Sequence, residues 1–285
     1  MDNNTGINPI NKDLQKPRII KLAMLGAAAV GICILFIAAF IGFQPDQLSL
    51  SDRYFPSPRP TFTRTPTPTP TPNLTATQQV IQSTATAQAI QTTIANAGSQ
   101  WPILFEDQFD ANSNHWATGL DDDEYARISR EVKNGKYIWD TTSKKGFVGW
   151  ITADTKSVID FYLSVEAQRI EGSSSDYGLI FRNDTKDNFY YFAIADEGFF
   201  VSLNYNDEWK DVIDWTQSSA IVPEAPNRMT IIAEGSHFIF LINDQYVADV
   251  TDEHILKGTT ALAIQVYEAD LKANFEFDNL ELRTP

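Results

Sequence analysis

From Trp101 to the C-terminus, short runs of Val, Ile, Phe, Tyr and Trp alternate with polar residues and are separated by Gly, Asn and Asp turns. Runs such as YIWDTT, FYYFAIA and HFIFLIN have the period of two that places one face of a strand in a core. Hairpins are predicted in LINDQYVADV, which turns at NDQ, and in IIAEGSHFIFLIN, which turns at Glu234-Gly235-Ser236. A sheet of so many strands must close or fold into two packed layers. Residues 101–285 are therefore predicted to form an all-β, two-sheet antiparallel jelly-roll sandwich.

The N-terminal region contains a different pattern, an uncharged apolar run from Leu22 to Phe43. At 1.5 Å per residue this run spans about 33 Å as a helix, which is close to the hydrocarbon thickness of a bilayer. It is longer than the apolar core of a signal peptide and lacks an A-x-A cleavage site, so a retained transmembrane helix is predicted. Four basic residues lie in the 21 residues before it, and the positive-inside rule then predicts a cytoplasmic tail, 1–21, and a C-terminal domain outside the cell membrane.

Residues 44–100 are rich in Thr, Pro, Ala and Gln and are predicted to be an extracytoplasmic linker. The RTPTPTPTP stretch favours polyproline II, which acts as a semi-rigid spacer. Further on, Thr75 and Gln78 fit a capping box, and apolar residues recur at helical spacing as far as Gly98. This thin apolar stripe is compatible with a marginal helix and equally with disorder.

Charge narrows the range of partners. Residues 101–285 carry 15 Lys and Arg against 33 Asp and Glu, a net charge of −18. Nucleic acids and anionic lipids are bound through cationic surfaces, so neither is expected as a ligand of this domain. The only cysteine, Cys33, lies in the apolar run, which excludes a disulfide framework and a cysteine-based metal site.

The order of YGLIFRND, FYYFAI, NRMTIIAEGSHFIFLINDQYVAD and the terminal FDNLEL, after the opening LFEDQFD and HW, resembles concanavalin A-like lectin/glucanase sandwich domains. Within this superfamily the chain is most similar to the branch that contains laminin-G-like modules and the 3-keto-disaccharide hydrolase-like family. The resemblance covers essentially all of residues 101–285 and implies a sandwich fold. It says less about activity, because one fold hosts many functions.

One catalytic motif is suggested by the resemblance. Glu276, Asp278 and Glu281 fit E-x-D-x-x-E, the spacing that retaining glucanases of this fold use for a nucleophile, an assisting aspartate and an acid/base. A β-bulge near Asp278 is predicted to place the three carboxylates on one outward face. However, only four residues follow the motif, and Phe277 and Asn279 stand where the family has aliphatic residues. A solvated strand face is therefore the preferred interpretation.

No cofactor is predicted, although Asp107, Asp110 and Asp278 could bind a structural calcium ion. The first and last strands are neighbours in the implied fold, which would bring these three carboxylates together.

Aromatic residues among polar neighbours are the candidates for ligand binding, since sugar rings stack on Trp and Tyr while their hydroxyls bond to polar groups. Trp209 and Trp215 lie in NDEWKDVIDWTQS and are predicted to be exposed. Arg182 is added because period two places it on a face that should be open. By contrast, Trp139 and Trp150 lie in apolar strands and are predicted to be core residues.

Together these features predict a single-pass, membrane-anchored and surface-displayed module that binds a glycan or another cell-envelope polymer without cleaving it. Two alternatives remain open: an anchored glycoside hydrolase-like enzyme that uses cleft carboxylates, and a structural or protein-interaction domain on a stalk.

Overall fold

A computed structural model of the chain describes residues 5–9 and 74–285. The predicted transmembrane segment 22–43 and the Thr-Pro part of the linker lie outside the described residues. Within the described ranges, no helix is both long enough and apolar enough to cross a membrane.

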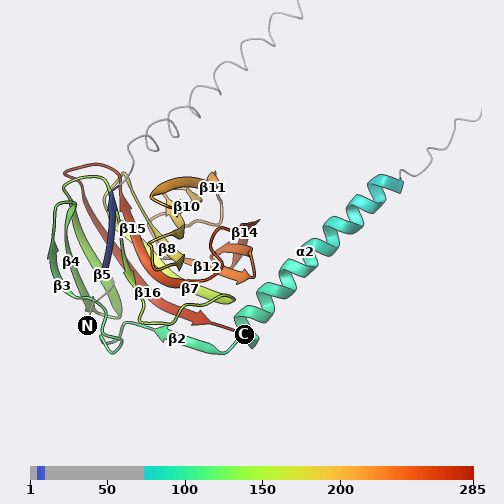
Figure 1. The fold of residues 1–285 in the computed structure, drawn as a ribbon, viewed down its shortest axis with the longest axis horizontal. Coiled ribbons are helices and arrows are strands. Elements are labelled where there is room, and N and C mark those ends of the chain that lie inside the picture. The colour runs from blue at the N-terminus through green and yellow to red at the C-terminus, as the bar shows by residue number, and fades with distance from the viewer. Residues whose placement is uncertain (1–4, 10–73) are drawn as a thin grey trace, which may run out of the picture. The chain divides into compact units, whose positions relative to one another are not determined.

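Two antiparallel sheets form the domain (Figure 1), which confirms the predicted β-sandwich. Sheet A consists, in spatial order, of β1 (Thr5–Pro9), β6 (Phe147–Thr152), β15 (Thr259–Val266), β8 (Ser175–Asn183), β9 (Phe189–Ala195), β10 (Gly198–Tyr205) and β11 (Glu208–Gln217). Sheet B consists of β14 (Gln245–Thr251), β13 (His237–Ile242), β12 (Asn227–Glu234), β7 (Phe161–Glu171), β16 (Lys272–Arg283), β5 (Lys136–Ser143), β4 (Ala126–Lys133) and β3 (Gly119–Asp122), with β2 (Ile103–Asp107) paired to β16.

The core between the sheets follows from the period of two. In β5, Tyr137 and Trp139 are buried while Asp140 is exposed, and in β16 Phe275 and Phe277 are buried in the same alternating way. Each large apolar side chain that leaves water in this way stabilises the fold by about 1.5–3 kcal/mol. The alternation in the sequence therefore determines which face of each sheet packs against the other.

Both predicted hairpins are present. Strands β12 and β13 pair from Glu234 and His237 onward, and β13 and β14 pair around Asn243 and Asp244. The last two residues have positive φ angles of 51° and 61°. Asn and Asp tolerate this left-handed conformation better than most residues, and a tight two-residue hairpin turn requires it.

A β-bulge interrupts β16, as predicted from its apolar pattern. The register with β7 shifts between Asp278 and Glu281, and Asn279 has a φ of 49°. Because of this extra residue, Leu280 and Leu282 return to the core face after Phe277.

Sheet A is buried on both faces, which the sequence pattern did not predict. Strands β8 and β9 are buried at every position. A second apolar cluster, separate from the core between the sheets, contains alternate residues of β6, β8, β9 and β15, among them Trp150, Ile180 and Phe189. These side chains therefore form the outward face of sheet A.

Strand β1 is the edge strand of sheet A. It pairs antiparallel with β6, with Thr5 opposite Ile151 and Pro9 opposite Phe147. The N-terminal residues 5–9 thus cover the hydrogen-bonding edge of β6, a strand whose residues Phe147–Ile151 are all buried. An apolar edge strand without a partner is prone to pair with other chains, so this contact has a protective effect.

A helix, α2 (Leu74–Gln100), precedes the sandwich, so of the two possibilities for the linker end the helical one is confirmed. Its residues 74–86 belong to a separate unit, whereas 87–100 belong to the same compact unit as the strands. In that second part, Ile90, Ile94 and Ala97 lie at helical spacing and pack with Trp101 on sheet B. The receiving patch consists of Tyr162, Ile232, Ile239 and Leu241. The domain boundary predicted at Trp101 therefore falls inside a packed interface.

This interface predicts that Ala97→Asp detaches the end of α2 from sheet B. Ala97 is fully buried, and a carboxylate in that position would lose its hydration without gaining a partner. We expect residues 87–100 to lose amide-exchange protection while the strands keep theirs, with a loss of about 1–3 kcal/mol in unfolding free energy. Gln91→Asp, at an exposed position of the same helix, is the control. Unchanged protection in Ala97→Asp would contradict the interface.

Candidate functional site

The outward face of sheet A presents three partly exposed aromatic rings along its β10–β11 end. Phe200 and Trp209 are half-buried against the outward cluster, and Trp215 is 37% exposed. We call Phe200, Trp209 and Trp215 the aromatic strip. Phe200 faces outward because Phe199 and Val201, which alternate with it, point into the core between the sheets. Trp209 is opposite Asn204 and Trp215 lies against Gly198, two positions of β10 that alternate in step with Phe200.

Trp215 is seated on the backbone of the neighbouring strand. A Cβ atom on Gly198 would come within 2.3 Å of the indole ring, so this position must be glycine for the ring to lie where it does. The indole Nε1 donates a hydrogen bond of 3.3 Å to the carbonyl of Ala195. These two contacts hold the ring against the backbone of β10, and 37% of the side chain remains exposed.

Trp209 is the outer end of an aromatic row that crosses sheet A. Its ring meets the edge of Phe189 with centroids 5.6 Å apart, and Phe189 meets Trp150 at 5.1 Å. Strands β15 and β8 lie between β6 and β9, and the small outward residues Ala261 and Ala263 of β15 leave room for this contact. The row gives Trp209 a rigid support.

The predicted positions of Trp215, Trp139 and Trp150 are confirmed, whereas Trp209, predicted to be exposed, is half-buried. The binding role of Trp209 and Trp215 stays a prediction. Trp209 and Trp215 are at the surface, whereas Trp139 is fully buried between the sheets and Trp150 is 2% exposed.

Arg182 does not lie where the sequence pattern places it. It is 0% exposed, and its guanidinium donates hydrogen bonds to the carbonyls of Ile255, Ile159 and Gly235. The guanidinium also stacks on Phe238 at 4.8 Å. The cause is a register shift at the end of β8, where Arg182 has a φ of 52°, so period two no longer holds. The expectation of an open face at Arg182 is therefore wrong.

A buried carboxylate lies on the same outward face of sheet A and was not predicted. Asp176 is 0% exposed and accepts hydrogen bonds from the hydroxyls of Tyr191, at 2.5 Å, and Tyr267, at 2.8 Å. Tyr191 on β9 lies opposite Ile180 on β8. Between this pair and Asp176, the outward-facing positions are Gly178 and Ala193, which lie opposite each other. Their small size lets the phenol ring reach the carboxylate.

Burial raises the pKa of Asp176 to about 7, although the hydrogen bonds from Tyr191 and Tyr267 and the nearby Arg169 act to lower it. Burial also raises the pKa of the Tyr191 hydroxyl well above its usual value, and the adjacent Asp176 adds to this rise. The two phenols therefore remain protonated donors at neutral pH, while Asp176 titrates there. The sequence gives one indication of this site: Asp176, Gly178 and Ile180 are spaced two apart along β8, so they share its outward face.

The carboxylates of the E-x-D-x-x-E motif lie on the outward side of β16, as the bulge predicted. Asp278 pairs with Lys136 at 2.6 Å, and Glu281 pairs with Arg283. Glu276 is half-exposed on the same face. Two of the three carboxylates thus have cationic partners in their own sheet, and a catalytic role of the set stays a prediction.

Two of the three carboxylates proposed for calcium, Asp107 and Asp278, have other contacts. Asp107 is buried and accepts hydrogen bonds from the backbone of Phe109 and the side chains of Asn114 and Trp116, each at 2.7 Å. In the part of the chain that the structure describes, no three His, Cys, Asp or Glu residues are grouped closely enough to hold a metal ion.

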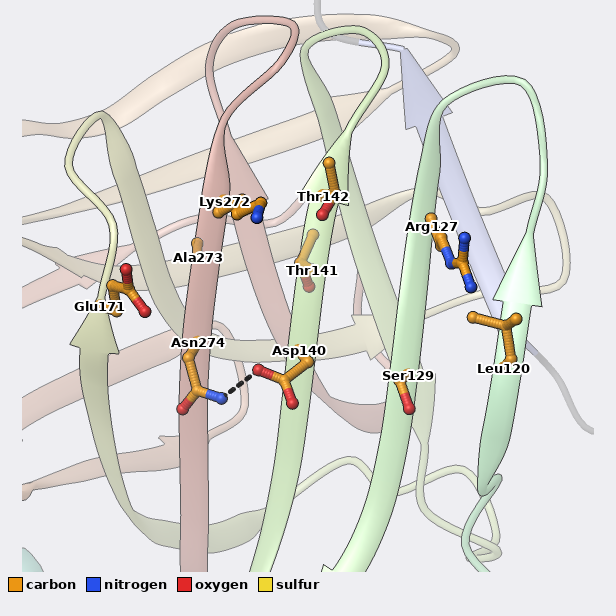
Figure 2. A pocket seen from close by; sticks show the side chains of 10 residues that line it. All are labelled: Leu120, Arg127, Ser129, Asp140, Thr141, Thr142, Glu171, Lys272, Ala273 and Asn274. Atoms are coloured by element: carbon orange, nitrogen blue, oxygen red, sulfur yellow. Dashed lines mark hydrogen bonds between the residues drawn. The ribbon is translucent and has the colours of Figure 1, made fainter.

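A polar groove lies on the other side of the sandwich, on the outward face of sheet B (Figure 2). Its volume is about 360 Å³, and five strands contribute to its lining. Neither the aromatic strip nor Asp176 lies in it.

Comparisons with known proteins agree with the sandwich architecture. The sequence model of the family described as the 3-keto-alpha-glucoside-1,2-lyase-like domain matches residues 100–283. No curated protein matches the chain.

Among solved structures, the GlcNAcα1-4Gal-releasing endo-β-galactosidase from Clostridium perfringens is 10% identical, with a TM-score of 0.50 over 66% of this chain and 64% of that one. Carbohydrate-binding module CBM66 from Bacillus subtilis is 18% identical, with a TM-score of 0.46 over 59% and 96%. The laminarinase catalytic domain from Thermotoga petrophila is 11% identical, with a TM-score of 0.47 over 65% and 98%. At these identities the likeness concerns the fold alone.

The raised pKa of Asp176 predicts a pH-dependent loss of stability. The folded chain keeps this proton up to about pH 7, whereas the unfolded chain releases it near the ordinary value of 3.8. The stabilisation that this proton gives the folded chain is complete below about pH 4 and is lost as the pH rises through about 7. Asp176→Asn carries no charge, and its Oδ1 can accept from one tyrosine while its Nδ2 donates to the other, so its unfolding free energy should fall less than that of the wild type over this range. Asp270→Asn, at an exposed position, should follow the wild type. Parallel curves for wild type and Asp176→Asn would refute the assignment.

Proposed function

The chain belongs to the 3-keto-alpha-glucoside-1,2-lyase-like domain family, and from this premise we propose that its sandwich binds glycans without cleaving them. The observation that carries the proposal is the aromatic strip. Trp209 and Trp215 present indole surface on one face of an edge strand, and their positions are fixed by Phe189 and Gly198. Rigid, partly exposed indoles suit the apolar face of a sugar ring.

Charge supports a choice among glycans. The net charge of −18 over residues 101–285 repels uronates and sulfated chains, so neutral or cationic glycans are the better ligands. Asp211 and Asp214, which lie between the two indoles in the sequence of β11, place acidic groups close to the strip.

The environment of the carboxylates supports binding over catalysis. Glycoside hydrolysis by the usual route needs two carboxyl groups that flank the scissile bond. Both oxygens of Asp176 are used by tyrosines away from solvent, and Asp278 and Glu281 have ion-pair partners. An incubation of the purified chain with neutral oligosaccharides that released new reducing ends would overturn this part of the proposal.

We further propose that residues 22–43 anchor the chain in the cell membrane and that the linker holds the sandwich outside. The uncharged run and the basic residues before it support this arrangement. The pairing of Thr5–Pro9 with β6 counts against a single span between them, because two paired strands must lie on the same side of the membrane.

Replacement of Trp215 by Ala is predicted to lower glycan affinity at least about tenfold while the fold remains, because the ring is exposed and contributes stacking area. Wild-type affinity should lie in the micromolar to millimolar range. Glycan-array screening followed by calorimetry on the best ligand measures both.

Tyr246→Ala, which removes an exposed ring from sheet B, is the matched control. Trp150→Ala should instead destabilise the fold by about 3–5 kcal/mol. Unaltered binding in Trp215→Ala would exclude the strip as the binding surface.

Membrane topology can be decided with paired cysteines. Asn8 and Val148 are opposite each other in the β1–β6 pair, so Asn8→Cys with Val148→Cys, in a Cys33→Ser background, should cross-link on oxidation only if both strands share a compartment. With a cytoplasmic N-terminus we expect no cross-link in intact cells, and added protease should release a folded fragment that begins between residues 44 and 100. Efficient cross-linking would place both strands on one side of the membrane and would therefore contradict a single span at residues 22–43.

A further inference from the structure

The groove on sheet B is lined by two parallel rows of side chains with opposite character. In the first row Glu171, Asn274, Asp140 and Ser129 are successive neighbours across β7, β16, β5 and β4. This row offers mainly hydrogen-bond acceptors, since it contains two carboxylates, an amide and a hydroxyl.

The second row offers donors. Lys272, Thr142 and Arg127 are successive neighbours across β16, β5 and β4, two residues further along each strand. Two residues of strand separate the rows by about 6.6 Å. Figure 2 shows both rows on the side of the sheet that faces the viewer.

Most of these charged groups are available to a ligand. Arg127, Lys272 and Glu171 are exposed. Within the described residues, the side chains of Lys272 and Glu171 have no hydrogen bond or ion pair, whereas Arg127 acts on Asp122, whose pKa is lowered first by Lys144 and also by Arg127. Asp140 accepts a hydrogen bond of 2.5 Å from Asn274, which fixes both side chains at the floor of the groove and leaves further acceptor capacity on the carboxylate.

We infer that this groove is a second saccharide-binding site, which takes an uncharged sugar by hydrogen bonds along both edges of the ring rather than by stacking. The two cations balance the two carboxylates, so the groove has no net charge that would select an ion. Vicinal hydroxyls both donate and accept, and they can therefore bridge an acceptor row and a donor row. No aromatic residue lines the groove, which distinguishes it from the aromatic strip. The inference extends the proposed function to the opposite sheet and does not depend on Trp215.

Saturation-transfer NMR on the full-length chain, with cellobiose and laminaribiose as probes, tests the inference. The Trp215→Ala chain serves as the background, because it removes the main stacking contribution of the strip. We expect residual binding in this background, which Asp140→Ala or Arg127→Ala should weaken at least about tenfold through lost charge-assisted hydrogen bonds. Glu131→Ala, on the same face of β4 but outside the groove, should leave it unchanged.

The outcomes separate the two sites. Loss of all binding in Trp215→Ala alone would refute the groove and leave the strip in place. Residual binding that is unaffected by both groove variants would also refute it. Binding that is insensitive to Trp215→Ala but sensitive to Asp140→Ala would support the groove and contradict the proposed role of the strip. No binding of either probe to the wild type would count against the groove, and thermal unfolding verifies that each variant is folded.

Discussion

The domain depends on the burial of both faces of sheet A. Its central strands β8 and β9 have no exposed position, yet only one of their faces packs against sheet B. The other face is also buried, and aromatic rings pack across its strands, Trp150 on Phe189 and Tyr191 on Phe200. Close packing of this kind tolerates few changes in volume. The aromatic strip and the Asp176 cluster both lie on this layer, so the geometry of each follows from it.

The two outward faces of the sandwich differ in the side chains that they present. That of sheet A is aromatic, with its exposed rings limited to the β10–β11 end. The outward face of sheet B is divided: an apolar patch around Ile232 and Leu241 receives α2, and the groove lined by Asp140 and Lys272 lies in its polar part. The receiving patch and the groove share only β7, where they use opposite ends of the strand, Tyr162 and Glu171, so attachment of the helix leaves the groove accessible.

Local sequence patterns predicted much of this fold and part of the candidate site. Alternation identified the strands, the hairpin residues Asn243 and Asp244, the bulge at Asn279 and the difference between Trp150 and Trp215. The failures involve contacts between residues far apart in the chain. A register shift against β15 moves Arg182 inward, and Asp176 is enclosed by tyrosines from β9 and from the end of β15. The docking of Ala97 likewise requires a sheet face that no local pattern describes.

The seat of Trp215 on Gly198 has a consequence for how related sequences can vary. The indole occupies the volume that any side chain at 198 would need, so the two positions form a single steric unit. A lineage could lose the tryptophan first and then acquire a larger residue at 198, whereas the reverse order would pass through a protein with a displaced ring. Substitutions at these two positions should therefore be correlated among homologues, and glycine at 198 should accompany tryptophan at 215.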